Sequence, residues 1–318
     1  MQTYTKPALT LEQQIELLQS RGLIINDTER AIRHLSNVSY YRLSAYMLPF
    51  KIMSYNGTVT DSFIKNTTWD DIWNLYKFDR KLRLLVFFLL VRIEIALRSQ
   101  ITYQLSHKYG SHWQDNNTIF KTTINSKTGK IYSVYNDIQS HITEQLNANR
   151  KVQFIEHYLK KYNNPQTPPS WMSIELLYFS ELSKICQGLN KKIDIKEIAD
   201  YFHIHNEKVF CSWLHSINYV RNICAHHGRL WNHIFAIQPT KYKKPSADRI
   251  WLSENELKTV KNSRLYYFLC TILYILQTVN PNTKFRVHFT ELLNLYPNVN
   301  VHYMGFPKDW KNNSLWNI

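Results

Sequence analysis

The side chains best suited to chemistry lie in one short polar segment near the middle of the sequence. Twelve residues hold two arginines, two asparagines and two histidines: Arg221, Asn222, His226, His227, Arg229 and Asn232. Histidine can give or take a proton near neutral pH. Arginine offers a planar fork of donors that suits a phosphate or a charged phosphoryl transition state. The set therefore predicts acid–base chemistry at a phosphodiester.

The missing residue types narrow this chemistry. No cluster of carboxylates accompanies the segment, so two-metal hydrolysis has little support. In RNA the 2′-hydroxyl is an internal nucleophile beside the scissile phosphate. A site of histidine and arginine would then cleave RNA without a metal or another cofactor, but it would not suit DNA. Two alternatives stay open: His226 and His227 as a pair of metal ligands, and the segment as a phosphate clamp without catalysis.

The predicted helix sets a constraint on this site. A helix is expected over Val209–His226, with Gly228 as its terminator. On an ideal helix Arg221 and His226 are about 140° apart. They meet only if the helix ends or bends between them, or if a second copy of the chain supplies the partner. The spacing therefore favours a composite site across the two-fold axis of a homodimer.

The clearest helix that could support the site begins near Trp69 and lasts to about Leu105, as one helix or as two with a kink. It contains Glu94 and Arg98, four residues apart in a largely apolar stretch. Such a pair is either a buried structural ion pair or part of a site. The apolar runs Leu84–Val91 and Leu265–Val279 are shorter than the roughly 20 residues of a membrane-spanning helix, and both are expected to be buried core helices.

Further signals predict an all-α fold with a small insertion. Thr10 and Gln13 fit a capping box that opens a helix over Leu11–Ser20, and Asp27 fits the cap of the next one. Other helices are expected at 137–146 and 152–162, and from Ser170 or Ser173 to about residue 189. Residues 118–134 predict a hairpin or ordered loop that turns near Ser126–Lys130. We expect one domain over 1–318: an N-terminal helical part (1–68), a helical core (69–280) and a C-terminal extension (281–318).

Composition indicates the partner and the compartment. The formal net charge of +15 favours a polyanion, of which nucleic acid is the commonest. Four scattered cysteines argue against a disulfide scaffold or a structural zinc site, and the first ten residues lack a secretory signal, so a cytoplasmic protein is expected. The candidate phosphate contacts can equally be solvated surface charges; they are Arg229, Lys191, Lys192, Lys241, Lys243 and Lys244.

Arg221-Asn222-x-x-x-His226, followed by His227-Gly228-Arg229-x-x-Asn232, resembles the signature of the AbiD/AbiF abortive-infection family of bacterial phage-defence proteins. That family belongs to the HEPN superfamily of α-helical RNases. The likeness extends over nearly the whole chain, through the segments Lys6-Pro7, Leu11–Gly22, Ser39–Leu43, Arg92–Arg98, Met304–Pro307, Trp310 and Leu315-Trp316.

The resemblance implies a HEPN-type helical bundle that forms a homodimer with two facing motifs. It implies metal-independent RNA cleavage that leaves a 2′,3′-cyclic phosphate and a 5′-hydroxyl. His226 would be the acid and base, Arg221 would stabilise the phosphate and the transition state, and Asn222 would orient both. His227 also satisfies the spacing, so which histidine acts is open. Supporting roles would fall to Glu94, Arg98 and Asn232.

These expectations describe a ribonuclease effector of abortive infection with RNA as its substrate, no cofactor and no membrane. Some relatives are thought to work with a small non-coding RNA, so such an RNA is a second expected partner. HEPN toxins that are silenced by adenylylation carry a tyrosine where this chain has Gly228, so that control is not expected. The alternative is a non-catalytic RNA-binding protein that uses the same motif as a phosphate clamp.

Overall fold

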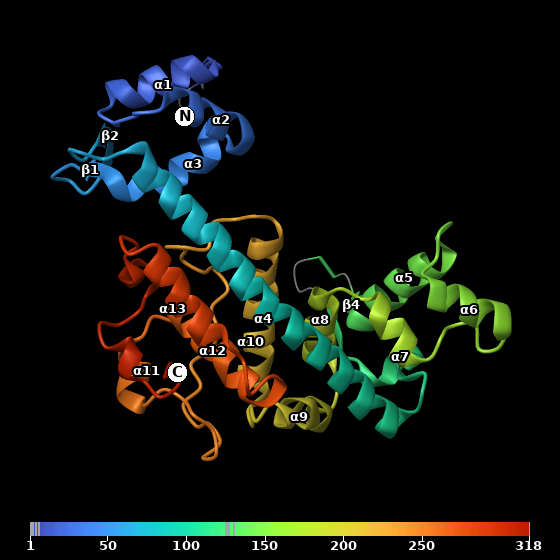
Figure 1. The fold of residues 1–318 in the computed structure, drawn as a ribbon. Coiled ribbons are helices and arrows are strands. Elements are labelled where there is room, and N and C mark those ends of the chain that lie inside the picture. Colours follow the sequence, from blue (N-terminus) through green and yellow to red (C-terminus); the bar gives the residue numbers. More distant parts are fainter. Residues whose placement is uncertain (1–2, 4, 6, 125–127, 130, 318) are drawn as a thin grey trace. The chain divides into compact units, whose positions relative to one another are not determined.

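The computed structural model describes residues 3, 5, 7–124, 128–129 and 131–317. These residues are mostly α-helical and include two small antiparallel sheets, so the helical fold class is confirmed at this level. Figure 1 shows the elements coloured in chain order, from blue at the N-terminus to red at the C-terminus. Two compact units are formed, one by Met1–Arg83 with Phe289–Asn300 and the other by Leu84–His288 with Val301–Ile318. The single-domain division proposed above stays a prediction, because compactness does not show which part folds alone.

The first unit opens with helices α1 (Leu11–Ser20), α2 (Thr28–Val38) and α3 (Tyr40–Met47), and a 3₁₀ turn, η1 (Leu48–Phe50). The capping box is confirmed, since the Gln13 backbone N–H donates to Thr10 Oγ1 at 3.2 Å and the Thr10 N–H donates to Gln13 Oε1 at 2.9 Å. Asp27 caps α2 through the N–H of Arg30. A hairpin of β1 (Lys51–Met53) and β2 (Val59–Phe63) follows, which the sequence analysis did not predict.

A buried polar triad lies in the core of this unit. Asp79 is fully buried, and Arg83 and Tyr46 are nearly so. The Tyr46 hydroxyl donates to Asp79 Oδ2 at 2.6 Å, and the Arg83 guanidinium donates to the same oxygen. Burial alone would lower the pKa of Arg83, but the Asp79 carboxylate raises it. The triad therefore satisfies three polar groups that would each be costly alone.

The long helix predicted from Trp69 is one continuous helix, α4 (Trp69–Tyr109), and it contributes to both units. Asp71 Oδ2 accepts a hydrogen bond from the Thr68 N–H at its start. The expected burial of the run Leu84–Val91 is wrong in part, because Leu84 is 66% and Phe88 59% exposed. An apolar run does not show which of its side chains face the core, because the helical period spreads them around the axis.

After α4 the second unit continues with short turns, η2 (Trp113–Asp115) and η3 (Asn117–Ile119). The hairpin predicted for 118–134 is confirmed as β3 (Thr122–Ile124) paired with β4 (Ile131–Ser133). Ser126, Lys127 and Lys130 of its expected turn, and Lys6, lie outside the described residues. Next come α5 (Val134–Asn147) and α6 (Gln153–Lys161), which correspond to the helices expected at 137–146 and 152–162.

The single helix expected from Ser170 or Ser173 to about residue 189 is wrong. The segment forms α7 (Ser170–Ser173), the 3₁₀ turn η4 (Ile174–Leu176) and α8 (Phe179–Gly188). Leu177 and Tyr178 are extended between them, and the Glu181 carboxylate caps the new helix start by accepting the Tyr178 N–H at 2.7 Å. The remaining elements are α9 (Lys192–Tyr201), α10 (Glu207–Ala225), α11 (Glu254–Thr259), α12 (Leu265–Val279), α13 (Phe285–Leu295), η5 (Val301–Met304) and η6 (Trp310–Asn312).

Helix α12 is the centre of the second unit. Every side chain from Leu265 to Leu276 is buried, which confirms the sequence prediction of a core helix. Residues after α13 pack on it, with Trp316 Nε1 donating to Cys270 Sγ at 3.4 Å. No helix in the described part of the chain is both long enough and apolar enough to cross a bilayer.

Gly305 lets the C-terminal segment approach the start of α12. Its φ is +86°, and an added Cβ would lie 2.5 Å from Arg264 Cβ. We expect Gly305→Ala to lower the free energy of unfolding by about 2–4 kcal/mol, through backbone strain and this overlap. Gly110→Ala is the matched control, because Gly110 has φ +88° and open space around it. It should cost about 1–2 kcal/mol in the same denaturant titration, and equal losses would contradict the packing argument.

Candidate functional site

Helix α10 positions the polar segment. Its N-terminus is capped by Asn206, whose Oδ1 accepts the Val209 N–H at 3.0 Å. Its last helical residue is Ala225, and His226 is the C-cap. The His227 N–H donates to the Cys224 carbonyl at 3.2 Å and the Gly228 N–H donates to the Ile223 carbonyl at 2.8 Å. These two crossing bonds form a Schellman motif, the standard way to satisfy the last carbonyls of a helix.

The residue in the left-handed position of this motif is His227, with φ +58°, and not the predicted Gly228. Gly228 has another role, because a Cβ there would lie 3.2 Å from Ile223 Cγ2 and 3.3 Å from the Ile223 carbonyl oxygen. A left-handed conformation is unfavourable for a residue with a Cβ. The cap therefore places a histidine in a backbone conformation that favours glycine.

The helix end also separates the motif residues. Arg221 and Asn222 are half-buried in the last turn of α10, whereas His226 and His227 are exposed just beyond it. The helix thus ends between Arg221 and His226, which is one of the conditions under which the sequence allows them to meet.

Arg221 is held by helix α4. Its Nε lies 3.8 Å from Glu94 Oε2, and its guanidinium carbon lies 5.9 Å from the centroid of the Phe87 ring. Arg221 Nε is buried and has no hydrogen-bond partner among the described residues. The charge is thus oriented by a carboxylate and a ring, while its guanidinium keeps hydrogen-bonding capacity for an anion.

Glu94 connects Arg221 with Arg98. Its second oxygen, Oε1, lies 3.3 Å from Arg98 Nη2. The side chains of Glu94 and Arg98 are only 17% and 11% exposed, so solvent screens this pair less than a surface pair. Sequence reasoning left open whether the pair is structural or part of a site. In the structure Glu94 contacts both arginines, because Oε2 faces Arg221 and Oε1 faces Arg98.

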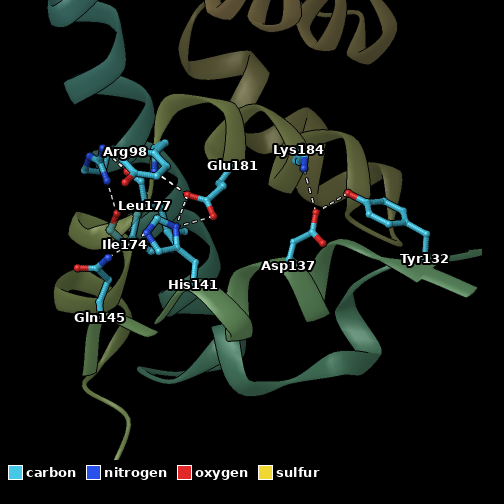
Figure 2. A network of polar contacts seen from close by, with 10 residues as sticks. Arg98, Tyr132, Asp137, His141, Gln145, Ile174, Leu177, Glu181 and Lys184 are labelled. Carbon is cyan, nitrogen blue, oxygen red and sulfur yellow. Dashed lines mark hydrogen bonds and ion pairs between the residues drawn. The ribbon is translucent and has the colours of Figure 1, made fainter. Parts of the chain in front are cut away.

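Arg98 fastens the turn between α7 and α8. Figure 2 shows its guanidinium at the carbonyl oxygens of Ile174 and Leu177. Arg98 Nε also lies 3.7 Å from Glu175 Oε2. The same figure shows further polar contacts between residues that lie outside this turn. Arg98 therefore fixes this turn, and it also holds the Glu94 carboxylate through the oxygen that does not face Arg221.

The continuation of this network was missed by the sequence analysis. Glu181, which caps α8, accepts from His141 Nδ1 of α5 at 2.7 Å (Figure 2). Beside it, Lys184 and Tyr132 donate to Asp137 Oδ2, each at 2.9 Å. Burial alone would raise the pKa of Asp137, but these hydrogen bonds lower it. The only local signal was Glu181 three residues after Tyr178, and nothing in the sequence pairs α5 with α8.

Asn232 lies in the loop after the motif and contacts Arg264, the N-cap residue of α12. It has φ +51°, and its Oδ1 accepts a hydrogen bond from Arg264 Nη1 at 2.9 Å. The next residue, His233, has its Nε2 3.1 Å from the Tyr219 hydroxyl of α10. Burial and the nearby charge of Arg229 lower the pKa of His233. Asn232 is thus placed to anchor the loop, and His233, which the sequence analysis missed, ties the loop to α10.

The predicted phosphate contacts have different surroundings. Lys241 donates to the Leu257 carbonyl, so it has a structural contact. Lys191 Nζ lies 5.6 Å from the Tyr109 ring centroid and remains exposed. Lys192, Lys243 and Lys244 are also exposed. A role for these residues or for the half-buried Arg229 in RNA binding stays a prediction.

The unusual cap gives a stability prediction. His227→Gly removes the Cβ from a left-handed position, so we expect the free energy of unfolding to rise by about 0.5–1 kcal/mol. His226→Gly is the control, because His226 has φ −90° and gains nothing from glycine there. It should leave the stability unchanged or lower it. Chemical denaturation of both variants checks this, and a loss of stability in His227→Gly would contradict it.

Comparison with known proteins identifies the family. A family model described as Abi-like protein matches residues 33–232, which is more than half of the chain and contains Glu94, Arg98 and the whole segment from Arg221 to Asn232. No curated protein and no solved structure matches the chain. On this match the chain belongs to the Abi-like protein family.

Proposed function

We propose that the chain is an endoribonuclease effector of abortive infection, a HEPN-type enzyme of the AbiD/AbiF subtype. Membership of the Abi-like family supports the role in phage defence. The observation that carries the catalytic part is the placement of Arg221. Glu94 and Phe87 orient its guanidinium in the last turn of α10, at the end where His226 and His227 are exposed.

The proposed reaction needs only these groups and the RNA. A neutral imidazole, of His226 or of His227, takes the proton of a 2′-hydroxyl, and the 2′-oxygen forms a bond to the adjacent phosphorus. The P–O5′ bond breaks, and a protonated imidazole gives its proton to O5′. The products are a 2′,3′-cyclic phosphate and a 5′-hydroxyl. Arg221 stabilises the negative charge that builds on the phosphoryl oxygens, and Asn222 orients the phosphate.

The acting histidine would come from one copy of the chain and Arg221 from the other, with the same imidazole taking the first proton and giving the second. A stripe of exposed apolar side chains on α4 supports this dimer: Leu84 (66% exposed), Phe88 (59%), Val91 (37%) and Ile95 (60%). At 100° per residue these four positions fall within an arc of about 60°. Phe87 and Glu94, which contact Arg221, lie on the neighbouring face of the same helix. A second copy packed along the stripe would shield apolar surface close to both Arg221 residues.

The test is cleavage of mixed single-stranded RNA in excess EDTA, with analysis of the end groups. Wild-type protein should yield cyclic phosphate and 5′-hydroxyl ends. Arg221→Ala and His226→Ala should each lower the rate by about 10²–10⁴-fold while RNA binding survives. His227→Ala in the same assay decides which histidine acts. Lys261→Ala is the control, since this exposed lysine lies outside the motif and outside the candidate phosphate contacts and should leave the rate nearly unchanged.

Two outcomes would contradict the proposal. RNA binding without cleavage, both by protein alone and with extract of phage-infected cells, would favour the non-catalytic phosphate clamp. Cleavage at an equal rate by wild type, Arg221→Ala and both histidine variants would place the activity elsewhere or in a contaminant.

A further inference from the structure

Three side chains of the second unit form a hydrogen-bonded chain that the proposed reaction does not use. Asp200 Oδ1 lies 2.6 Å from His205 Nδ1, and His205 Nε2 lies 2.7 Å from Ser246 Oγ. A carboxylate, an imidazole and a hydroxyl connected in this order are the parts of a catalytic triad. Such triads are recognised by these distances and roles, because they occur in several chain orders on unrelated folds. Local sequence patterns did not indicate the set, since Ser246 is distant in the chain from the other two residues.

The contacts of His205 determine which ring nitrogen carries the proton in its neutral form. Nδ1 faces a carboxylate, which only accepts, so Nδ1 is the N–H that donates to Asp200. Nε2 then has a lone pair and accepts the Ser246 hydroxyl. The His203 carbonyl is a second acceptor for that hydroxyl, but at 3.3 Å it is the more distant one. His205 Nε2 is therefore placed as a general base for the serine oxygen.

The end of helix α9 brings His205 back to Asp200. The His203 N–H donates to the Asp200 carbonyl at 2.9 Å, and the Ile204 N–H donates to the Ala199 carbonyl at 3.1 Å. These bonds form a second Schellman motif, in which His203 has φ +57°. A left-handed conformation is unfavourable for a residue with a Cβ, and it persists where the surroundings fix it. The reversal of the chain places the His205 ring beside the Asp200 carboxylate.

Two tyrosines hold the backbone of the other two members. The Ser246 N–H donates to the Tyr274 hydroxyl at 3.4 Å, and that hydroxyl donates to the His203 carbonyl at 2.8 Å. The His205 N–H donates to the Tyr242 hydroxyl at 3.1 Å. Both tyrosines are buried, and Tyr274 belongs to the core helix α12. The three side chains are thus supported by the core, which is what precise catalytic geometry requires.

The turn that begins at Ser246 has two N–H groups available beside the serine. The Arg249 N–H donates to the Ser246 carbonyl at 3.1 Å, which closes a four-residue turn. Within the described residues, the N–H groups of Ala247 and Asp248 in the middle of this turn donate to no acceptor. In triad hydrolases the N–H of the residue after the nucleophile commonly stabilises the oxyanion that forms when a carbonyl is attacked. The turn therefore supplies donors for such an oxyanion.

We propose that Ser246 is the nucleophile of a second active site, which hydrolyses activated carboxylic esters through an acyl-serine. His205 Nε2 takes the hydroxyl proton while Ser246 Oγ bonds to the carbonyl carbon, and the N–H groups of Ala247 and Asp248 stabilise the oxyanion. The ester C–O bond breaks, and the alcohol leaves with the proton from His205. Water then attacks the acyl-serine and gives a proton to His205. The carboxylic acid leaves, and His205 returns that proton to Ser246 Oγ.

The exposure of the site indicates the substrate class. The side chains of Asp200 and His205 are 37% and 50% exposed, so the site does not exclude water. Donors stabilise an oxyanion less in an open site than in a dry one. Such a site suits an ester with a good leaving group, because its C–O bond breaks more easily than the C–N bond of an amide. The inference is independent of the proposed ribonuclease, since the two sets of residues do not overlap.

Labelling with a fluorophosphonate probe is the test, with peptide mass spectrometry to locate the label on the full chain. A serine oxygen that a base has activated bonds to the phosphorus, and fluoride leaves. Wild-type protein should carry the label on Ser246. His205→Ala should slow labelling about 10²–10⁴-fold, and Asp200→Asn should also slow it, because an amide does not fix the same tautomer. His157→Ala is the matched control, since this exposed histidine lies outside the set and should not change the rate.

Hydrolysis of p-nitrophenyl acetate, with acetyl-Ser246 detected by mass spectrometry, gives a second readout. Ala247→Pro should lower the acetylation rate about 10²–10³-fold, because proline suits this turn position but has no N–H. Wild-type protein that unfolds cooperatively but carries no label on Ser246 would overturn the inference and leave the three residues as a structural link. Equal labelling rates in wild type and His205→Ala would also overturn it. Ser246→Ala should cleave RNA at the wild-type rate, so a failure of either proposed activity is seen separately.

Discussion

Mixing two inactive chains, Arg221→Ala and His226→Ala, is expected to restore about a quarter of the wild-type cleavage rate if the site joins one copy's arginine to the other copy's histidine. Random exchange makes half of the dimers mixed, and each mixed dimer has one intact site out of two. Each variant alone should be about 10²–10⁴-fold slower than wild type. This is the largest change that the proposed dimer predicts.

The measurement is the initial rate after co-refolding the two chains in equal amounts. Adding Phe88→Asp to both chains is the control, because a carboxylate in the exposed α4 stripe should prevent pairing and abolish the recovery. A rate that stays at the level of the single variants would contradict a composite site and would place Arg221 and His226 of one chain together. Recovery that persists with Phe88→Asp would show that the copies pair through another surface.

Asp79→Ala is expected to lower the free energy of unfolding of the first unit by about 3–5 kcal/mol. The substitution leaves the buried Arg83 charge without its carboxylate and the Tyr46 hydroxyl without its acceptor. A buried charge without a partner is far less stable than either the pair or an apolar replacement. Denaturant unfolding followed by tryptophan fluorescence checks this value.

The double variant Asp79→Leu with Arg83→Leu tests the cause. It removes both charges, so it should recover most of the stability that Asp79→Ala loses. Glu29→Ala is the surface control, because the Glu29 side chain is 91% exposed in its ion pair with Arg33 and should contribute little. If the double variant is as unstable as Asp79→Ala, lost packing and not the stranded charge explains the effect.

Local signals predicted the helix starts well. The Thr10 capping box and the Asp27 cap are seen as expected, because a cap depends on residues only three apart. The same logic failed at Ser170 and Ser173, where a 3₁₀ turn intervenes and Glu181 caps a later start. The extended residues Leu177 and Tyr178 are stabilised partly by Arg98, which is distant in sequence, and no local pattern reports that contact.

At the candidate site, too, the sequence revealed local patterns but not the contacts between residues that are distant in sequence. Sequence spacing singled out Arg221 and the two histidines, and it singled out Glu94 as a possible support. It did not show that Glu94 faces Arg221, because that contact depends on how α10 packs on α4. Nor did it show that Leu84 and Phe88 are exposed, since apolar character fits a core and an interface equally well. Their catalytic and dimer roles stay predictions.

The left-handed His227 has a consequence for how such sequences change over generations. The left-handed backbone at this helix end suits glycine or asparagine better than histidine, so the proposed site is expected to require that the imidazole be kept. Copies of the gene that no longer protect their host are expected to acquire glycine or asparagine here early, while Gly305, which its backbone conformation and its packing both require, is retained as long as the chain still folds. The residue at position 227 would then distinguish working copies from decaying ones in genome surveys.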